Sequence, residues 1–191
     1  MKKALLIASV LFVAVVSTAC INNIAVQELN NKAAEYMQKG DFESAMNRLQ
    51  ASIDLDSTIY ETYYNLGIAS IKANKYDKAI EAFEKGIELK PDFSNFYYSL
   101  AVAQSDYADK ILDNNDEVES ASITEDEKVV EKKKDLSKED LKKVNSLKIK
   151  SKENFVKYLE LEENSKDKEN IESLVKDIDE YLEENNLKVE E

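Results

Sequence analysis

The stretch NLGIASIKANKYDKAIEAFEKG, residues 65–86, contains two of the three glycines in this chain of 191 residues. Gly67 and Gly86 both lie among residues that favour helices, chiefly Ala, Lys and Glu. A glycine in the interior of a helix costs about 1 kcal/mol relative to alanine. We therefore expect these positions to require the absence of a side chain, because another part of the chain packs closely against them.

The stretch belongs to a pattern that recurs along the chain. Residues 40–56, GDFESAMNRLQASIDLD, align with residues 74–90, NKYDKAIEAFEKGIELK, at a spacing of 34 residues. The preceding segments match at the same spacing, and a third copy begins at residues 96–104, FYYSLAVAQ. The equivalent residues are Ala33, Gly67 and Ala101; Phe42 and Tyr76; Ala45 and Ala79; Leu49 and Phe83; and Ser52 and Gly86. An unrelated helical bundle would not place small residues at such matched positions.

This combination of residues and spacing resembles the tetratricopeptide repeat family, whose pattern is W-x2-L-G-x2-Y, then A-x3-F, then P. In the second copy Tyr63 replaces the Trp and Ser70 replaces the Tyr, and the matching residues are Leu66, Gly67, Tyr76, Ala79, Phe83 and Pro91. The first copy, about residues 26–59, ends in Ser57 where Pro is usual. The resemblance implies an all-α fold, a solenoid of antiparallel helix pairs in which each repeat stacks on its neighbours.

The repeat gives each glycine a structural role. Gly40 and Asn74 occupy equivalent places in the turns QKGD and KANK, where both residue types tolerate a left-handed backbone at a helix end. Gly67 and Gly86 fall where helices meet most closely, and small residues there allow the close approach. Bulky residues such as Phe83 are expected to fill the space around the contact.

The repeat spacing breaks after residue 105, and an acidic segment low in bulky apolar residues follows. We therefore expect the third repeat to be interrupted. The predicted parts are repeats 1 and 2 with helix A of repeat 3 at residues 26–112, an acidic insertion at 113–136, helix B of repeat 3 at 137–165, and a C-terminal capping helix and tail at 166–191.

Two features identify helix B of the third repeat. Ser137 and Asp140 have the spacing of a helix N-cap. Further along, KENFVKYLELEEN resembles the end of the second repeat, so that Phe155 takes the place of Phe83. Residues 166–185 then have one apolar face, which is typical of a helix that covers the end of a repeat array. Such a face is also suited to docking a partner.

The N-terminal residues have the pattern of an export signal. A basic MKK precedes the apolar run ALLIASVLFVAVV, which is shorter than the about 20 residues of a membrane-spanning helix. The following STAC resembles the cleavage site of bacterial lipoproteins, although Ser17 stands where these usually carry Leu. The resemblance implies a lipoprotein signal peptide at residues 1–19, lipidation of Cys20, and a lipidated tether at residues 20–25. Ordinary signal cleavage and an uncleaved signal anchor are the alternatives.

A lipid on Cys20 would place the protein in a bacterial cell envelope, facing the periplasm or the exterior. Because residue 21 is Ile and not Asp, the sorting rule of enteric bacteria would send it to an outer membrane, if the host has one. An anionic membrane surface would repel a protein of formal net charge −13, so a covalent lipid is needed to hold it there.

The composition argues against several classes of function. With no His and one Cys, the chain has neither a Cys/His zinc site nor a His-based catalytic triad. Its net charge disfavours nucleic acid as a partner. Asp113, Asn115 and Glu117 have the spacing of a calcium loop, but Val118 stands where that loop needs Gly. We therefore expect a protein that is not an enzyme and has no metal or other cofactor.

The resemblance also implies that helix A of each repeat lines a concave groove, which in this family holds an extended peptide or a partner helix. Carried over by position, the groove comprises Asn30, Ala34, Met37 and Gln38; Glu61, Tyr64, Asn65, Ile68, Ile71 and Lys72; and Asn95, Tyr98, Ser99 and Val102. We single out as partner-binding residues Asn31, Tyr64, Asn65, Ile68, Lys72 and Tyr98. Asn31 and Asn65 are equivalent, and side-chain amides there can bond to a peptide backbone.

The groove lacks one known specificity of the family. Members that bind chaperones grip a terminal carboxylate with a clamp of Lys, Asn, Lys and Arg, but Ala34, Asn95 and Ser99 stand at clamp positions here. The clustered tyrosines also suit an aromatic box for a small ligand, a less favoured alternative.

We therefore expect a membrane-anchored scaffold or adaptor that binds a segment of a partner protein. The alternatives are a component of an outer-membrane protein assembly machine, and a structural surface lipoprotein without a specific peptide ligand.

Overall fold

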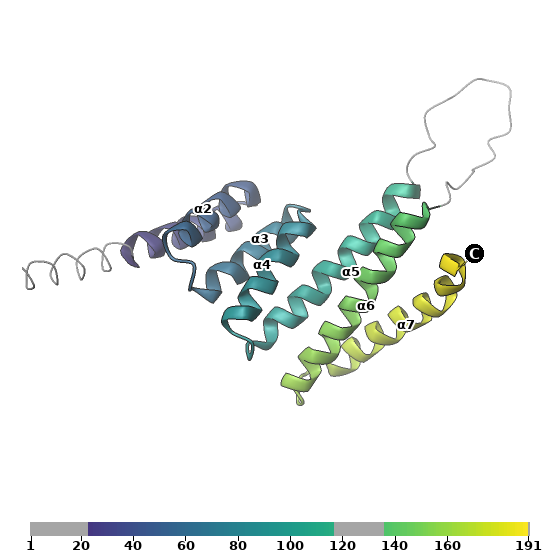
Figure 1. Ribbon diagram of the computed structural model, residues 1–191. Helices are drawn as coiled ribbons and strands as arrows, with labels where there is room; N and C mark the ends of the chain where they lie inside the picture. The colour runs from purple at the N-terminus through teal and green to yellow at the C-terminus, as the bar shows by residue number, and fades with distance from the viewer. Residues whose placement is uncertain (1–22, 117–135, 191) are drawn as a thin grey trace, which may run out of the picture. The chain divides into compact units, whose positions relative to one another are not determined.

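The computed structural model describes residues 23–116 and 136–190, and these residues form helices joined by short turns, without a strand. The predicted all-α fold is therefore confirmed. Cys20, the signal peptide and residues 117–135 of the predicted insertion lie outside the described residues. The helices drawn in Figure 1 divide between two compact units, Met1–Lys90 and Pro91–Glu191. Each unit has its own buried cluster.

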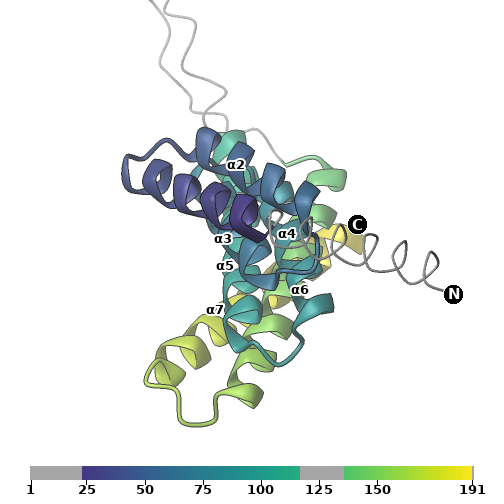
Figure 2. The same ribbon diagram turned by 90° about the vertical axis from the view of Figure 1, so that its left-hand side faces the viewer.

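The first unit consists of two helix pairs, as expected for two repeats. The first pair is formed by the helix over residues 23–38 and α2 (Phe42–Leu55), and the second by α3 (Tyr60–Lys72) and α4 (Tyr76–Leu89) (Figure 2). One buried cluster joins Ala33 of the first helix to Ala45 and Leu49 of α2 and to Ala69 of α3. The matched small residues thus lie in the contacts between helices.

Two equivalent turns close these helix pairs in the same way. Gly40 has a φ of 74° and Asn74 has a φ of 56°. The amide of Lys75 donates to the carbonyl of Ser70 at 2.8 Å, and the equivalent bond in the first turn is 3.0 Å long. These bonds satisfy carbonyl groups that the end of a helix leaves open. The predicted left-handed turns at Gly40 and Asn74 are confirmed.

Gly67 marks a very close approach within the second helix pair. The fully buried ring of Phe83 on α4 lies so near α3 that a Cβ atom on Gly67 would be 2.3 Å from its Cε1 atom. Non-bonded carbon atoms pack at about 3.5–4.0 Å, so a side chain does not fit. Gly86 is also buried, on α4. The expectation that Gly67 requires the absence of a side chain is confirmed.

The second unit contains α5 (Ser94–Asp116), α6 (Lys138–Leu161) and α7 (Lys168–Glu190). α6 begins directly after Ser137, whose hydroxyl accepts a hydrogen bond from the amide of Asp140 at 3.0 Å. The predicted N-cap is confirmed. α5 continues past residue 112, so the first four residues of the predicted insertion are helical. The early turns of α6 pack beside α5, where the ammonium of Lys143 donates to the hydroxyl of Tyr107 at 2.6 Å.

The pairing of α5 with α6 repeats that of α3 with α4. Phe155 shares a buried cluster with Ala101, just as Phe83 packs against Gly67. Beside this contact the hydroxyl of the buried Ser151 donates to the carbonyl of Ala101 at 2.8 Å. This geometry supports the interpretation of α6 as helix B of a third repeat.

α7 covers an apolar side of the α5–α6 pair. Ile171, Ile178 and Leu182 of α7 are buried in the cluster that contains Phe155. Elsewhere α7 carries exposed lysine–glutamate pairs four residues apart. An apolar face toward the repeats and a charged outer face are what a capping helix requires.

One buried charge departs from the apolar pattern. Lys148 of α6 is buried at the position that corresponds to Tyr76 of the second repeat. Its ammonium donates to the carboxylate of Asp109 at 2.6 Å and to the hydroxyl of Ser105 at 3.2 Å, and it lies 5.9 Å from the ring centroid of Tyr181. Because a buried ammonium is costly unless it is paired, these contacts hold α5 and α6 in register.

We predict that Gly67→Ala lowers the free energy of unfolding by about 1–3 kcal/mol, although alanine is the better helix former by about 1 kcal/mol. The reason is the overlap of the added methyl group with the ring of Phe83. Urea unfolding followed by circular dichroism measures the change. The control is the same Gly67→Ala change made in a protein that also carries Phe83→Leu, where the loss of unfolding free energy should be smaller. An equal loss with Phe83 and with Leu at position 83 would contradict the proposed contact.

We also predict that removing Asp109 destabilises the protein more than removing Lys148. Asp109→Asn leaves a buried ammonium without its carboxylate, which should cost about 1–3 kcal/mol. Lys148→Met removes the buried charge and keeps most of the volume, so we expect a smaller loss or none. Urea unfolding compares the two variants. If Lys148→Met lowers the free energy of unfolding more than Asp109→Asn does, the ion pair stabilises the protein by more than the burial of the Lys148 ammonium destabilises it.

Candidate partner-binding surface

Each unit presents its own part of the predicted groove. Of the residues singled out from the sequence, Asn31 lies on the helix over residues 23–38, and Tyr64, Asn65, Ile68 and Lys72 lie on α3. Tyr98 lies on α5, in the second unit.

In the first unit four of these residues form what we call the helix-A surface: Asn31, Asn65, Ile68 and Lys72. The first helix and α3 are neighbours, because the amide of Asn30 donates to the hydroxyl of Thr62 at 3.2 Å. Asn31, Asn65 and Lys72 are exposed and Ile68 is half-buried. The side-chain amides of Asn31 and Asn65 make no hydrogen bond within the described residues. Two equivalent amides are therefore available to a ligand.

Both predicted tyrosines pack on a phenylalanine of the helix that pairs with their own. The ring centroid of Tyr64 is 6.0 Å from that of Phe83, and the centroid of Tyr98 is 5.9 Å from that of Phe155 and 5.4 Å from that of Tyr158. Tyr64 is half-buried, whereas Tyr98 keeps 38% of its surface exposed. Both rings brace a helix pair, and Tyr98 offers the larger surface to a ligand.

The assignment of two other residues to the groove is wrong. The amide of Asn30 donates to the hydroxyls of Ser52 and Thr62, both at 3.2 Å, so Asn30 joins the first two repeats. Ser99 is buried, whereas the equivalent Asn65 is exposed. In both cases a polar side chain is used in packing and is not available to a partner.

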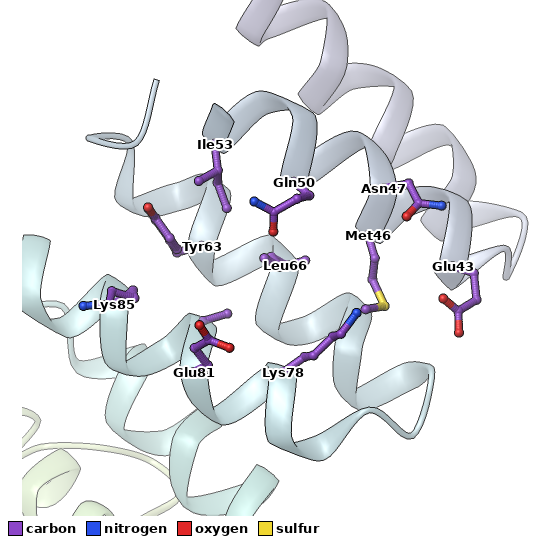
Figure 3. A pocket seen from close by; sticks show the side chains of 11 residues that line it. Glu43, Met46, Asn47, Gln50, Ile53, Tyr63, Leu66, Lys78, Glu81 and Lys85 are labelled. Carbon is purple, nitrogen blue, oxygen red and sulfur yellow. The ribbon is translucent and has the colours of Figure 1, made fainter. Parts of the chain in front are cut away.

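The first unit also has a pocket that the sequence interpretation missed. It encloses about 370 Å³ between α2 and α4 and reaches one side of α3 (Figure 3). Its lining residues are Glu43, Met46, Asn47, Gln50, Ile53, Tyr63, Leu66, Lys78, Glu81, Ala82 and Lys85. Tyr63, which stands at the position of the family's Trp, is half-buried and borders this pocket. The replacement of the family's Trp by Tyr at residue 63 is the feature of the sequence that could have indicated this pocket.

The α2–α4 pocket and the helix-A surface lie on opposite sides of α3. At about 100° per residue, the mean direction of Tyr63 and Leu66 differs from the directions of Asn65, Ile68 and Lys72 by about 130–170°. Variants in the pocket can therefore serve as controls for variants on the helix-A surface.

The second unit has a pocket on the face of α5 that corresponds to the helix-A surface. This α5–α7 pocket encloses about 430 Å³. Its lining residues are Val102, Ser105, Asp106, Asp109, Lys148, Phe155, Leu174, Asp177, Ile178 and Tyr181. Val102, a predicted groove residue, and Asp106, which is equivalent to Lys72 of the second repeat, both line this cavity.

Tyr181 gives the α5–α7 pocket an unused polar group. Its hydroxyl is buried and makes no hydrogen bond within the described part of the chain. Burial raises the pKa of this phenol, and the carboxylate of Asp109 raises the same pKa further. The hydroxyl therefore stays protonated at neutral pH, when it can both donate and accept a hydrogen bond.

The described ranges contain neither a cluster of metal ligands nor a membrane-spanning helix. No three or more His, Cys, Asp or Glu side chains are arranged there to hold a metal ion. Nor does any helix in these ranges combine the length and apolar character needed to cross a membrane.

Comparison with known families identifies the repeats. Residues 60–93 and residues 29–59 each match the tetratricopeptide repeat family. The chain is 32% identical over 62 residues to Small glutamine-rich tetratricopeptide repeat-containing protein 2 from Mycosarcoma maydis, and 35% identical over 66 residues to Hsp70-Hsp90 organizing protein 2 from Arabidopsis thaliana. The matched regions are 32% and 35% of this chain but only 18% and 12% of those proteins, so the chain matches a small part of the length of each relative.

Solved structures agree with this identification. The second TPR domain of the human RPAP3 protein, in complex with an HSP70 peptide, has a TM-score of 0.55 at 14% identity, covering 83% of this chain and 98% of that chain. The TPR2B-domain:pHsp70 complex of yeast Sti1 has a TM-score of 0.52 at 16% identity, with the same coverage. At these identities the likeness concerns the fold alone. Residues 29–93 are thus two tetratricopeptide repeats.

Proposed function

We propose that this protein is a membrane-anchored, non-catalytic interaction scaffold of a bacterial cell envelope, which binds a segment of a partner protein on its helix-A surface. The observation that carries the proposal is the pair of exposed amides of Asn31 and Asn65. They stand at equivalent places in two adjacent repeats and make no hydrogen bond within the described residues.

These amides match the chemistry of a peptide. Each side-chain amide both donates and accepts, as does each peptide group of an extended segment. Two of them on neighbouring helices can hold such a segment in one register. Ile68 adds an apolar contact beside them, and Lys72 adds a positive charge. The similar domain of human RPAP3 is described in complex with an HSP70 peptide, which supports a peptide as the class of ligand.

The bound segment is expected to be internal and not a C-terminal carboxylate. Ala34 and Asn95 are exposed at positions where the chaperone-binding members of the family carry parts of their carboxylate clamp. Neither side chain is charged, and an alanine has no donor to offer.

The anchoring part of the proposal rests on the lipoprotein-like sequence before Cys20 and on the nearness in sequence of the first described helix. The first helix already includes residue 23, so three residues of the predicted tether are helical. An extended chain reaches about 3.5 Å per residue, so a lipid on Cys20 would hold the first repeat within about 10 Å of the membrane surface. The partner segment is therefore expected to lie close to the membrane as well.

We predict that Asn31→Ala/Asn65→Ala abolishes retention of the partner when detergent-solubilised envelope is passed over the immobilised protein and bound proteins are identified by mass spectrometry. Both residues are exposed, so the thermal unfolding temperature should not change. Asn47→Ala/Gln50→Ala in the α2–α4 pocket is the matched control, because it removes the same number of amides from the opposite face. This control should retain the partner.

The same experiment decides between the proposal and its alternatives. Loss of binding in the control pair only would place the partner on the opposite face and contradict the proposed surface. No retained protein at all would favour a structural lipoprotein without a specific ligand. Retention of an outer-membrane β-barrel assembly factor would identify the more specific alternative, a component of that machine.

We further predict that Cys20→Ala abolishes incorporation of radiolabelled palmitate and releases the protein from the membrane fraction. The protein without its anchor should not return through charge, because its net charge is −13. Thr18→Ala is the control variant and should leave the label in place. If the palmitate label persists in Cys20→Ala, the lipid is attached to another residue, and the predicted lipidation of Cys20 is contradicted.

A further inference from the structure

The α5–α7 pocket differs in charge from the helix-A surface of the first unit. Three carboxylates, those of Asp106, Asp109 and Asp177, and one ammonium, that of Lys148, line it. The ammonium is already paired with Asp109 at 2.6 Å. Three negative groups and one positive group leave the lining with a formal charge of −2. The corresponding part of the first unit carries Lys72.

The rest of this pocket offers apolar surface. Phe155 and Ile178 are buried, Val102 is half-buried, and Leu174 of α7 is 43% exposed. Tyr98 packs on Phe155 and continues the apolar surface along α5. Large apolar side chains that stay exposed around a cavity, together with a few polar groups, are typical of a binding site.

The unpaired hydroxyl of Tyr181 completes the polar side of the pocket. A buried hydroxyl without a partner costs about 1–3 kcal/mol relative to one that is bonded. This hydroxyl is near both Asp109 and Lys148 in the lining but bonds to neither. A ligand with a polar hydrogen could satisfy it.

We propose that the α5–α7 pocket binds a peptide segment in which a Lys or Arg side chain stands next to a bulky apolar one. This proposal rests on the proposed scaffold function, because it names the chemistry of the segment that the scaffold holds. The apolar side chain packs between Val102 and Leu174 over Phe155. The cationic side chain lies against Asp177, where the hydroxyl of Tyr181 can accept one of its hydrogens.

The other candidate occupants satisfy the pocket less well. A second copy of this chain brings a net charge of −13 toward a lining that is already negative. A small inorganic cation would balance the carboxylates but would leave the apolar lining open to water. A basic and apolar segment matches both parts of the lining.

The binding test uses the full-length protein in detergent and a fluorescein-labelled, amide-terminated octapeptide of alternating lysine and leucine, followed by fluorescence anisotropy. One control peptide has glutamate in place of lysine, and another has serine in place of leucine. We expect the lysine–leucine peptide to bind at least about tenfold more tightly than either control. If the lysine–serine peptide binds as tightly as the lysine–leucine peptide, binding reflects only the attraction of a basic peptide to an acidic protein, and the proposal is overturned.

Variants place the binding within the pocket. We expect Asp177→Asn to weaken binding about fivefold and Leu174→Ala about threefold. Glu183→Gln removes the same charge from another side of α7, where Glu183 is exposed, and should change the affinity less than about twofold. Equal losses in Asp177→Asn and Glu183→Gln would overturn the assignment to this pocket.

Tyr181→Phe isolates the hydroxyl. It should weaken binding about threefold without lowering the unfolding temperature, because the hydroxyl makes no bond in the free protein. Lower stability with unchanged affinity would show a structural role only and would remove Tyr181 from the site.

Two measurements separate this proposal from others. Sedimentation of the free protein reports self-association; a dimer that Leu174→Ala dissociates would make a second copy the occupant and overturn the proposal. The envelope retention experiment compares Asn31→Ala/Asn65→Ala with Asp177→Asn/Leu174→Ala. If only the first variant loses the partner, the assignment of binding to the α5–α7 pocket is overturned, whereas the proposed scaffold function stands. If only the pocket variant loses the partner, the α5–α7 pocket remains the proposed binding site and the helix-A surface of the first unit does not bind the partner.

Discussion

The contact between Gly67 and Phe83 is the constraint on which the arrangement of the first unit depends. Without a Cβ atom at residue 67, the ring of Phe83 lies directly against the backbone of α3, and the two helices of the repeat close on each other. The inner side of α3 is then committed to packing. The side chains of Asn65, Ile68 and Lys72 project from the outer side, where a partner can reach them. Ala101 and Phe155 repeat this contact in the second unit, which is why α5 presents Val102 and Asp106 in the same way.

Much of the fold follows from local requirements that single residues reveal. A spacing of 34 residues between matched small residues predicts the helix pairs, and Gly40 and Asn74 mark turns because few other residues adopt a positive φ. Ser137 marks the start of α6 because its hydroxyl caps the first turn. These signals depend on the backbone of a few neighbouring residues, so they can be recognised without knowledge of the tertiary contacts.

The features that sequence reasoning missed depend on contacts between distant side chains. Asn30 looks like a surface residue until Ser52 and Thr62 are seen within reach of its amide. Lys148 stands at an aromatic position of the repeat, and only the neighbouring Asp109 and Ser105 on α5 explain how its charge is tolerated there. The two pockets likewise require the packed helices, since their linings come from three helices each. Position within the repeat predicts the binding residues, but position alone does not show which of them are used in packing.

The central claim is that a partner contacts the helix-A surface and not the opposite face. The most direct measurement is photo-crosslinking in the envelope with a photoreactive amino acid in place of Asn65, compared with the same amino acid in place of Gln50 in the α2–α4 pocket. The account predicts a defined protein adduct from position 65 and none from position 50. An adduct from position 50 alone, or identical adducts from both positions, would contradict it.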